Sequence, residues 1–388
     1  MTRTRPSRIG KWNHAVPRRR GLLALGAVFT AGVLALATPA GASPQGSFIS
    51  HFSTISTVGS TVPANGDVNP YGIVVEPRTE GSLTAGHILV SNFNNATNAQ
   101  GTGTTIVDIA PNGTQQLFAQ IDVNHLNGSC PGGIGLTTAL SILPGGWVVV
   151  GSLPTTDGTA ATAKAGCLIV LDNHGHVAET WSGSPINGPW DMTAVPTPFG
   201  ADLFVANVLN GTVAAGGATV YGGTVVRIAV VIGHCHAPFR ISTQVIATGF
   251  AERTDPDALV VGPTGVAVGA NGSLYVADAV NNRIAEIDNP FFRFWPAQHG
   301  GETVTNGHFL NAPLGLAIAP NGNILTVNGA DGNLVETTRH GTQLPPVLLD
   351  NSGGPPPGVG ALFGLALAPY GQGLYFVDDA TNTLNLFH

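Results

Sequence analysis

The chain has 388 residues, of which 15 are Lys or Arg and 22 are Asp or Glu. Seven of the basic residues lie within residues 1–42, which contain no acidic residue, so the rest of the chain carries eight basic and 22 acidic residues, a formal charge of −14. This charge strongly disfavours binding to nucleic acid or to an anionic membrane, and it suits a cationic or neutral ligand.

Residues 1–42 have the features of a signal peptide. Basic residues are followed by an apolar run over 21–37 and by small residues at 40–42, which form a cleavage pattern. The arginine triplet at 18–20 fits a twin-arginine signal for export of a folded protein, and a Sec signal with adjacent arginines is the alternative. No later apolar run approaches the ~18 residues of a membrane helix. We therefore expect a mature domain over residues 43–388 that is secreted, periplasmic or on the cell surface, without an integral membrane span.

A strand-like segment, residues 47–55, precedes the first repeat described below. Alternation along it places four side chains on one face: Phe48, Ser50, Phe52 and Thr54. The last repeat ends with its third strand, Thr383–Phe387, and no sequence follows for a fourth. We expect residues 47–55 to pair there as the outermost strand and to cover an apolar edge. A disordered tail after the signal is the alternative.

Six copies of one pattern make up most of the chain. Each has a strand of small residues, a tight turn, a second strand that ends in a polar residue, and a third strand. The copies begin at Pro70, Thr138, Pro189, Gly262, Ala312 and Ala361. The longer intervals hold insertions, expected to be loops, at 229–240 and 249–260. Such small antiparallel units cannot bury both faces alone, but a closed ring of them can, so we predict an all-β, six-bladed β-propeller.

The clearest copy, GPTGVAVGANGSLYVADAVNNRIAEID at Gly262–Asp288, resembles the NHL repeat. The last two copies are similar to it, and the first three match approximately. Known NHL proteins form six-bladed propellers and include both lyases and binding modules, so the resemblance implies a fold and not an activity. Streptogramin lyases carry a Trp-Phe-Thr-Glu strand in each repeat, which the equivalent segments LYVAD, LTVN and LYFVD lack.

Two rings of residues should meet at the mouth of the central channel. Alternate loops of antiparallel strands lie on opposite faces, so the start of each first strand and the end of each second strand share one face. The entry ring contains Tyr71, Thr138, Trp190, Thr264, Leu314 and Phe363. The exit ring contains Asn92, Ser152, Asn207, Asp278, Asn328 and Asp378. The aromatic residues of the entry ring, with Asp191, are the ligand-binding candidates.

The polar positions on this face allow several interpretations. Short polar side chains stabilise turns by bonding to the backbone, but the oxygens of the exit ring could also hold Ca²⁺ or Mg²⁺. The metal candidates are Asn92, Asn207, Asp278 and Asp378. Asp191 stands where the clear repeats have glycine, and it either orients a ligand or cation or is bonded to backbone amides. As catalytic candidates we name His125 and His308, loop histidines that could act as a general base.

Two of the three cysteines should form a disulfide. Cys130 precedes the first strand of repeat two and Cys167 opens its third strand, so both emerge on the same face of one blade. Cys235 lies between His234 and His236 in the insertion of repeat three. We expect a thiol there, and a metal site is the alternative.

Two functions remain open at this stage. The first is a secreted, monomeric binding or scaffolding module whose channel mouth takes a small molecule, a peptide or a glycan. The second is a metal-assisted lyase or hydrolase that uses the exit ring and a loop histidine. The aromatic residues of the entry ring and the lack of a recognised catalytic motif favour the first.

Overall fold

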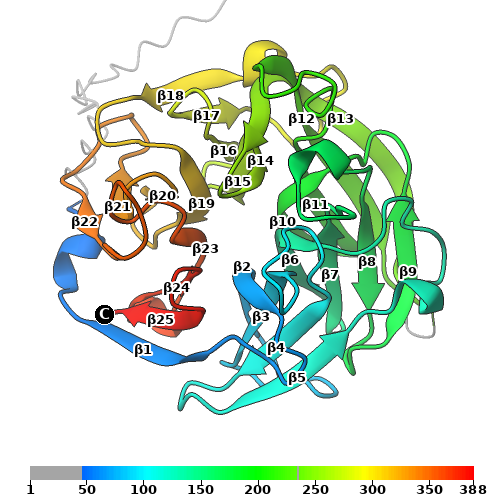
Figure 1. Ribbon diagram of the computed structural model, residues 1–388. Coiled ribbons are helices and arrows are strands. Elements are labelled where there is room, and N and C mark those ends of the chain that lie inside the picture. Colours follow the sequence, from blue (N-terminus) through cyan, green and yellow to red (C-terminus); the bar gives the residue numbers. More distant parts are fainter. Residues whose placement is uncertain (1–45, 234–235) are drawn as a thin grey trace, which may run out of the picture. The chain divides into compact units, whose positions relative to one another are not determined.

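The computed structural model describes residues 46–233 and 236–388, and the predicted signal peptide and Cys235 lie outside these residues. The described residues form 25 strands and five short 3₁₀ helices. The strands make six antiparallel sheets arranged as blades around a central axis (Figure 1). The predicted all-β, six-bladed β-propeller is therefore confirmed. No helix in the described part of the chain is long and apolar enough to cross a membrane.

Each blade runs from an inner strand at the axis to an outer strand at the rim. Blade 1 comprises β2 (Val68–Val75), β3 (Ile88–Asn94), β4 (Thr105–Ile109) and β5 (Gln115–Gln120). Blade 2 comprises β6 (Leu136–Leu143), β7 (Trp147–Ser152), β8 (Cys167–Leu171) and β9 (Val177–Ser182). Blade 3 comprises β10 (Pro189–Thr197), β11 (Gly200–Asn207), β12 (Val220–Val231), β13 (Phe239–Asp255) and β14 (Leu259–Val261). Blade 4 comprises β15 (Pro263–Val268), β16 (Leu274–Asp278), β17 (Arg283–Ile287) and β18 (Glu302–Asn306).

Blades 5 and 6 complete the ring. Blade 5 comprises β19 (Pro313–Ile318), β20 (Ile324–Asn328), β21 (Asn333–Thr337) and β22 (Val347–Leu348). Blade 6 comprises β23 (Leu362–Leu367), β24 (Leu374–Asp378), β25 (Thr383–Phe387) and β1 (Ile55–Ser60). The 3₁₀ helices are η1 (Ile49–His51), η2 (Val123–His125), η3 (Ala160–Thr162), η4 (Gln298–Gly300) and η5 (Pro369–Gly371).

The hydrophobic core lies between the blades. Every residue of β16 is buried, and so is every residue of β24, because a neighbouring blade covers each face of these strands. In one interblade cluster, Phe204 of blade 3 packs with Val276 of blade 4. Second strands therefore appear in the sequence as continuous apolar segments and not as alternating ones.

The ring is closed by the N-terminal segment, as predicted. Strand β1 pairs antiparallel with β25, with Ile55 opposite Phe387 and Ser60 opposite Thr383, and it forms the outer edge of blade 6 (Figure 1). The predicted position of the closing strand is wrong, however. The strand covers residues 55–60, and part of the expected strand at 47–55 forms η1 instead.

A buried carboxylate on blade 5 explains this shift. Glu336 accepts hydrogen bonds from the hydroxyl of Ser47 (2.6 Å) and from the backbone N–H groups of Phe48 (2.8 Å) and Ile49 (3.1 Å). The rings of Phe48 and Phe52 lie 5.1 Å apart, whereas an extended strand would separate residues four apart by about 13 Å. The chain therefore turns at Glu336 before it becomes extended.

The insertions of blade 3 are also more regular than predicted. Residues 229–240 and 249–260 were expected to be loops, but 229–231 extend β12, and 239–240 and 249–255 belong to β13, which pairs with β12 from Val220 opposite Glu252 to Val231 opposite Phe239. The end of β13 then pairs with β14 as a short hairpin. Backbone pairing satisfies amide groups that a long loop would leave to solvent, which favours the extended form.

Candidate ligand-binding channel

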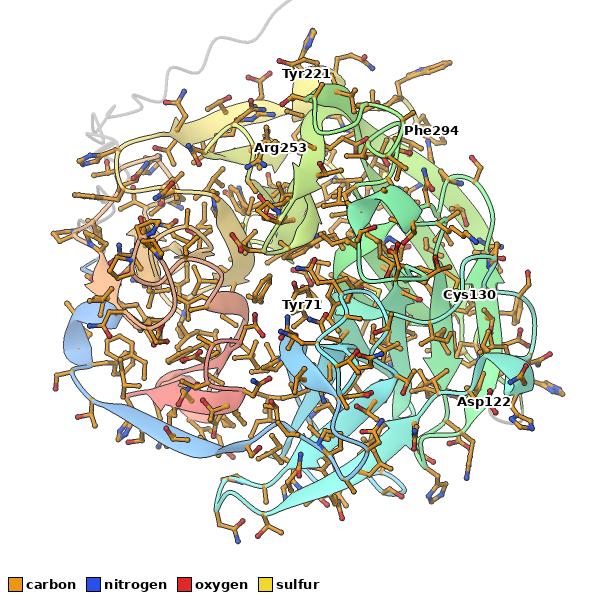
Figure 2. All side chains as sticks on the ribbon, in the orientation of Figure 1. Tyr71, Asp122, Cys130, Tyr221, Arg253 and Phe294 are labelled. Carbon is orange, nitrogen blue, oxygen red and sulfur yellow. A yellow bond between two sulfur atoms is a disulfide. The ribbon has the colours of Figure 1, made fainter. Side chains whose placement is uncertain are left out.

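Aromatic side chains close one end of the central channel. Tyr71, Trp190 and Phe363 are 2%, 2% and 0% exposed. The Tyr71 ring stacks on Phe363 and on Phe93, with ring centroids 3.8 Å and 4.5 Å apart, and Figure 2 shows Tyr71 near the middle of the ring of blades. We call these four residues the plug. The sequence predicted an open aromatic mouth, whereas the structure buries these rings in a core cluster.

Residues 255–261, which comprise the end of β13, the turn after it and β14, cover the plug, and we call them the cap. The Tyr71 hydroxyl donates to the carbonyl of Asp257 (3.3 Å), and the Trp190 indole N–H donates to the carbonyl of Val260 (2.9 Å). Leu259 of the cap is buried in the same cluster as the plug. These carbonyls satisfy the polar atoms of Tyr71 and Trp190, so both rings can be buried at the axis. Nothing in the repeat pattern indicated that this insertion reaches the axis.

Beyond the plug, the inner strands of all six blades line a cavity of about 430 Å³. The inner strands run away from the cap. Residues next to the plug, such as Asp191 and Gly364, are buried, while Val195, Val268 and Ile318 at the other end are half-buried. The channel is therefore closed at the cap and opens on the opposite face.

Asp191 is the only ionisable side chain among the residues that line this cavity. It is 9% exposed, and its carboxylate accepts hydrogen bonds from the N–H groups of Met192 (2.8 Å) and Val266 (3.3 Å). Burial raises the pKa of Asp191 to about 8, although both hydrogen bonds act to lower it. Asp191 is therefore bonded to backbone amides and lines the cavity, while its role in orienting a ligand or cation stays a prediction.

The equivalent positions in other blades show why Asp191 is unusual. A β-carbon at Gly315 would lie 2.2 Å from the carbonyl oxygen of Phe363, and one at Gly364 would lie 2.3 Å from that of Tyr71. Adjacent inner strands therefore approach too closely there for any side chain. Between blades 3 and 4, the Asp191 carboxylate instead bridges to the next inner strand through Val266.

The structure places the four metal candidates of the exit ring in four different blades. The Asn92 amide donates to the carbonyl of Thr61 (3.0 Å). Asn207 accepts from the N–H of Asn187 (3.1 Å), Asp278 from Arg283 (2.7 Å), and Asp378 from the N–H of Thr381 (3.1 Å). Within residues 46–233 and 236–388, no three His, Cys, Asp or Glu side chains are grouped so that they could hold a metal ion. Asp278 and Asp378 accept hydrogen bonds from backbone amides of their own turns, whereas Asn92 and Asn207 bond to segments that precede their strands.

The two catalytic candidates lie in loops outside the channel. The His125 side chain is 82% exposed and its Nδ1 lies 2.7 Å from a carboxylate oxygen of Asp122. His308 is exposed, and its ring stacks on Phe309 with centroids 3.7 Å apart. The first precedes blade 2 and the second precedes blade 5, so the structure does not bring them together.

The predicted disulfide between Cys130 and Cys167 is confirmed, with the two Cα atoms 5.3 Å apart. It joins the segment before β6 to the first residue of β8. Disulfides persist in oxidising compartments, which is where the protein would then be expected.

Asp379, beside the cap, is a titratable group that the sequence analysis missed. Burial, together with the nearby carboxylates of Asp378 and Asp257, raises the pKa of Asp379 to about 8. Burial and the nearby carboxylates of Asp379, Asp255 and Asp257 raise the pKa of Tyr71 well above its ordinary value, so Tyr71 remains a hydrogen-bond donor to the cap. The Asp-Asp pair at 378–379, where the other repeats have at most one acid, was the available signal.

Residues 261–286, which include β15, β16 and most of β17, match the NHL repeat. The protein is a six-bladed β-propeller with an NHL repeat. No match to a curated protein sequence was found.

Solved structures similar to this propeller include proteins with different activities. A streptogramin B lyase gives a TM-score of 0.50 at 12% identity, covering 86% of this chain and 97% of that chain. A gluconolactonase from Xanthomonas campestris gives 0.52 at 12% identity, covering 86% and 88%. The calcium-binding protein regucalcin from Agrobacterium tumefaciens gives 0.53 at 12% identity, covering 85% and 93%. At these identities the similarity shows the fold alone.

Proposed function

We propose that this propeller is an exported binding protein whose central channel takes a small organic molecule through the end opposite the cap. The observation that carries the proposal is a closed-ended cavity of about 430 Å³, lined by both polar and apolar groups, with a single buried carboxylate near its closed end. Ligand pockets commonly have volumes of about 300–1,000 Å³ and combine apolar walls with a few polar groups. The basic and apolar N-terminal sequence and the disulfide support export.

Binding is favoured over metal-assisted catalysis because the candidate catalytic groups are dispersed. His125 and His308 do not line the channel, and the oxygens of Asp278 and Asp378 are bonded within their turns. A general base must lie within about 3 Å of the proton that it removes, directly or through one water. Asp191 is the only side chain of the channel that could do this, and it has no catalytic partner among the lining residues.

The test is to fill the channel and measure ligand binding. Thr193 is a half-buried lining residue, so Thr193→Trp should occupy the cavity, while Thr156→Trp on an exposed loop is the matched control. Amines, alcohols, sugars, lactones and dipeptides would be screened against both variants and the wild type by thermal shift and titration calorimetry. We expect at least one class to bind the wild type and Thr156→Trp but not Thr193→Trp.

Two results would contradict the proposal. One is ligand binding that Thr193→Trp leaves unchanged. The other is wild-type turnover of a lactone, ester or cyclic peptide that is lost in His125→Ala or His308→Ala, which would favour the metal-assisted enzyme.

A further inference from the structure

We propose that the channel selects an organic cation, which places an ammonium or guanidinium group on the Asp191 carboxylate and the rest of its body along the inner strands. This inference deepens the proposed function, and it rests on the channel being the binding site. It assigns a chemical class to the ligand from the groups at the closed end of the cavity.

The Asp191 carboxylate has unused hydrogen-bonding capacity. An ionised carboxylate can accept about four hydrogen bonds. The backbone provides two, from Met192 and Val266, one to each oxygen. Because Asp191 lines the cavity, a ligand in the channel can supply the remaining donors.

No basic side chain of the described chain neutralises this carboxylate. Arg253, Arg283 and Arg293 pair with other aspartates, and every ion pair that involves histidine also lies elsewhere. A buried charge without a partner is costly, and it is relieved either by protonation or by an added cation. A cationic ligand would therefore gain more from this site than a neutral molecule of the same shape.

A second polar group lies close to the same end of the channel. The Thr138 side chain lines the cavity, is 4% exposed, and its hydroxyl has no hydrogen-bond partner within the described residues. Thr138 belongs to β6 and Asp191 to β10, the inner strands of adjacent blades. The buried Thr138 hydroxyl is therefore a second polar group without a partner among the residues that line the channel, and it can accept a hydrogen bond.

The rest of the lining is mixed in polarity. It includes the hydroxyl residues Ser141 and Thr193 as well as the aliphatic residues Ile142 and Ile318. Residues 43–388 carry eight basic and 22 acidic side chains, so the surrounding field also attracts cations.

The test compares three probes of equal length that differ only in their end group: 1-hexylamine, 1-hexanol and hexanoate. We expect the amine to bind the wild-type protein at least tenfold more tightly than the alcohol, and hexanoate to bind most weakly. In Asp191→Asn the preference for amine over alcohol should fall to less than threefold, while alcohol binding is retained. The comparison in the wild type needs no variant, so it remains decisive if the substitution disturbs folding. Thr138→Val should weaken amine binding by a smaller factor.

The pH dependence provides an independent readout. Below pH 8 Asp191 is largely protonated and must lose its proton to bind the ammonium, so amine affinity should rise as pH increases through 8 and level off above it. No other titratable side chain lines the channel from any of the six inner strands. Affinity for 1-hexanol should stay flat, as should amine affinity in Asp191→Asn.

The outcomes separate this inference from the proposed function. Equal binding of amine and alcohol that Thr193→Trp abolishes would overturn the selection of cations but leave the channel as the binding site. Amine binding that survives in Asp191→Asn would overturn it as well. If no probe binds at millimolar concentration and the wider ligand screen is also negative, both proposals fail.

Discussion

The two sides of the plug are built from neighbouring repeat positions but behave differently. On the cap side, the polar atoms of the aromatic side chains find carbonyls: Tyr71 bonds to Asp257 and Trp190 to Val260. On the cavity side, Asp191 bonds to backbone amides, and no ion pair of the described residues includes it. The difference shows that the cap side of the plug supports the fold, whereas the cavity side retains unused bonding capacity that a ligand can fill.

The largest expected effect comes from emptying the plug. Phe363→Ala removes a fully buried ring that stacks on Tyr71, and it should lower the free energy of unfolding by about 3–5 kcal/mol. The control is Phe294→Ala, since this ring is 79% exposed at the outside of the ring of blades (Figure 2). Its effect should stay within about 0.5 kcal/mol. Similar losses in urea unfolding of the two variants would show that the plug is not a stabilising element.

The next effect concerns the disulfide. Replacing both Cys130 and Cys167 with alanine should lower the free energy of unfolding by about 2–4 kcal/mol, because the bond restricts the unfolded chain over a separation of 37 residues. Unfolding of the double variant without reductant should resemble that of reduced wild type. If reductant destabilises the double variant as well, the effect does not come from this bond.

A third prediction separates the cavity side of the plug from the plug itself by pH. Asp191 has a pKa near 8 in the folded protein and about 3.9 when unfolded, so between these values the folded state keeps a proton that the unfolded state loses. Stability should therefore fall as pH rises from 5 to 8. Asp379 and Glu252, whose pKa values are also raised, contribute in the same direction. The difference in the free energy of unfolding between wild type and Asp191→Asn isolates the contribution of this one group. As pH rises from 5 to 8, this difference should shift in favour of the variant by at least about 1.4 kcal/mol.

The smallest expected effect is at the cap. Tyr71→Phe removes the hydroxyl that bonds to the carbonyl of Asp257 and keeps the stacked ring, so it should lower the free energy of unfolding by about 0.5–1.5 kcal/mol. Tyr370→Phe is the control, because Tyr370 is 96% exposed. A loss as large as that of Phe363→Ala would mean that the cap, and not the stacked rings, holds this end together.

Repetition made the architecture predictable. Each copy carries its own turn and apolar strands, and copies that cannot bury both faces alone must pack side by side. The disulfide was predictable from the same repeat pattern, because the positions of Cys130 and Cys167 within one repeat place them on one face. Features that break the repeat were predicted less well, as residues 47–55 show, where the carboxylate of Glu336 determines the local conformation.

For the site, the sequence alone singled out Asp191, since a carboxylate replaces the glycine of other repeats. It also determined six blades, a closing N-terminal strand and one disulfide. Only the tertiary structure decided which end of the channel is open, because the cap comes from an insertion that pairs with β13 and reaches the axis. Burial at the axis depends on contacts between segments far apart in the chain, and these contacts leave no periodic trace in the sequence.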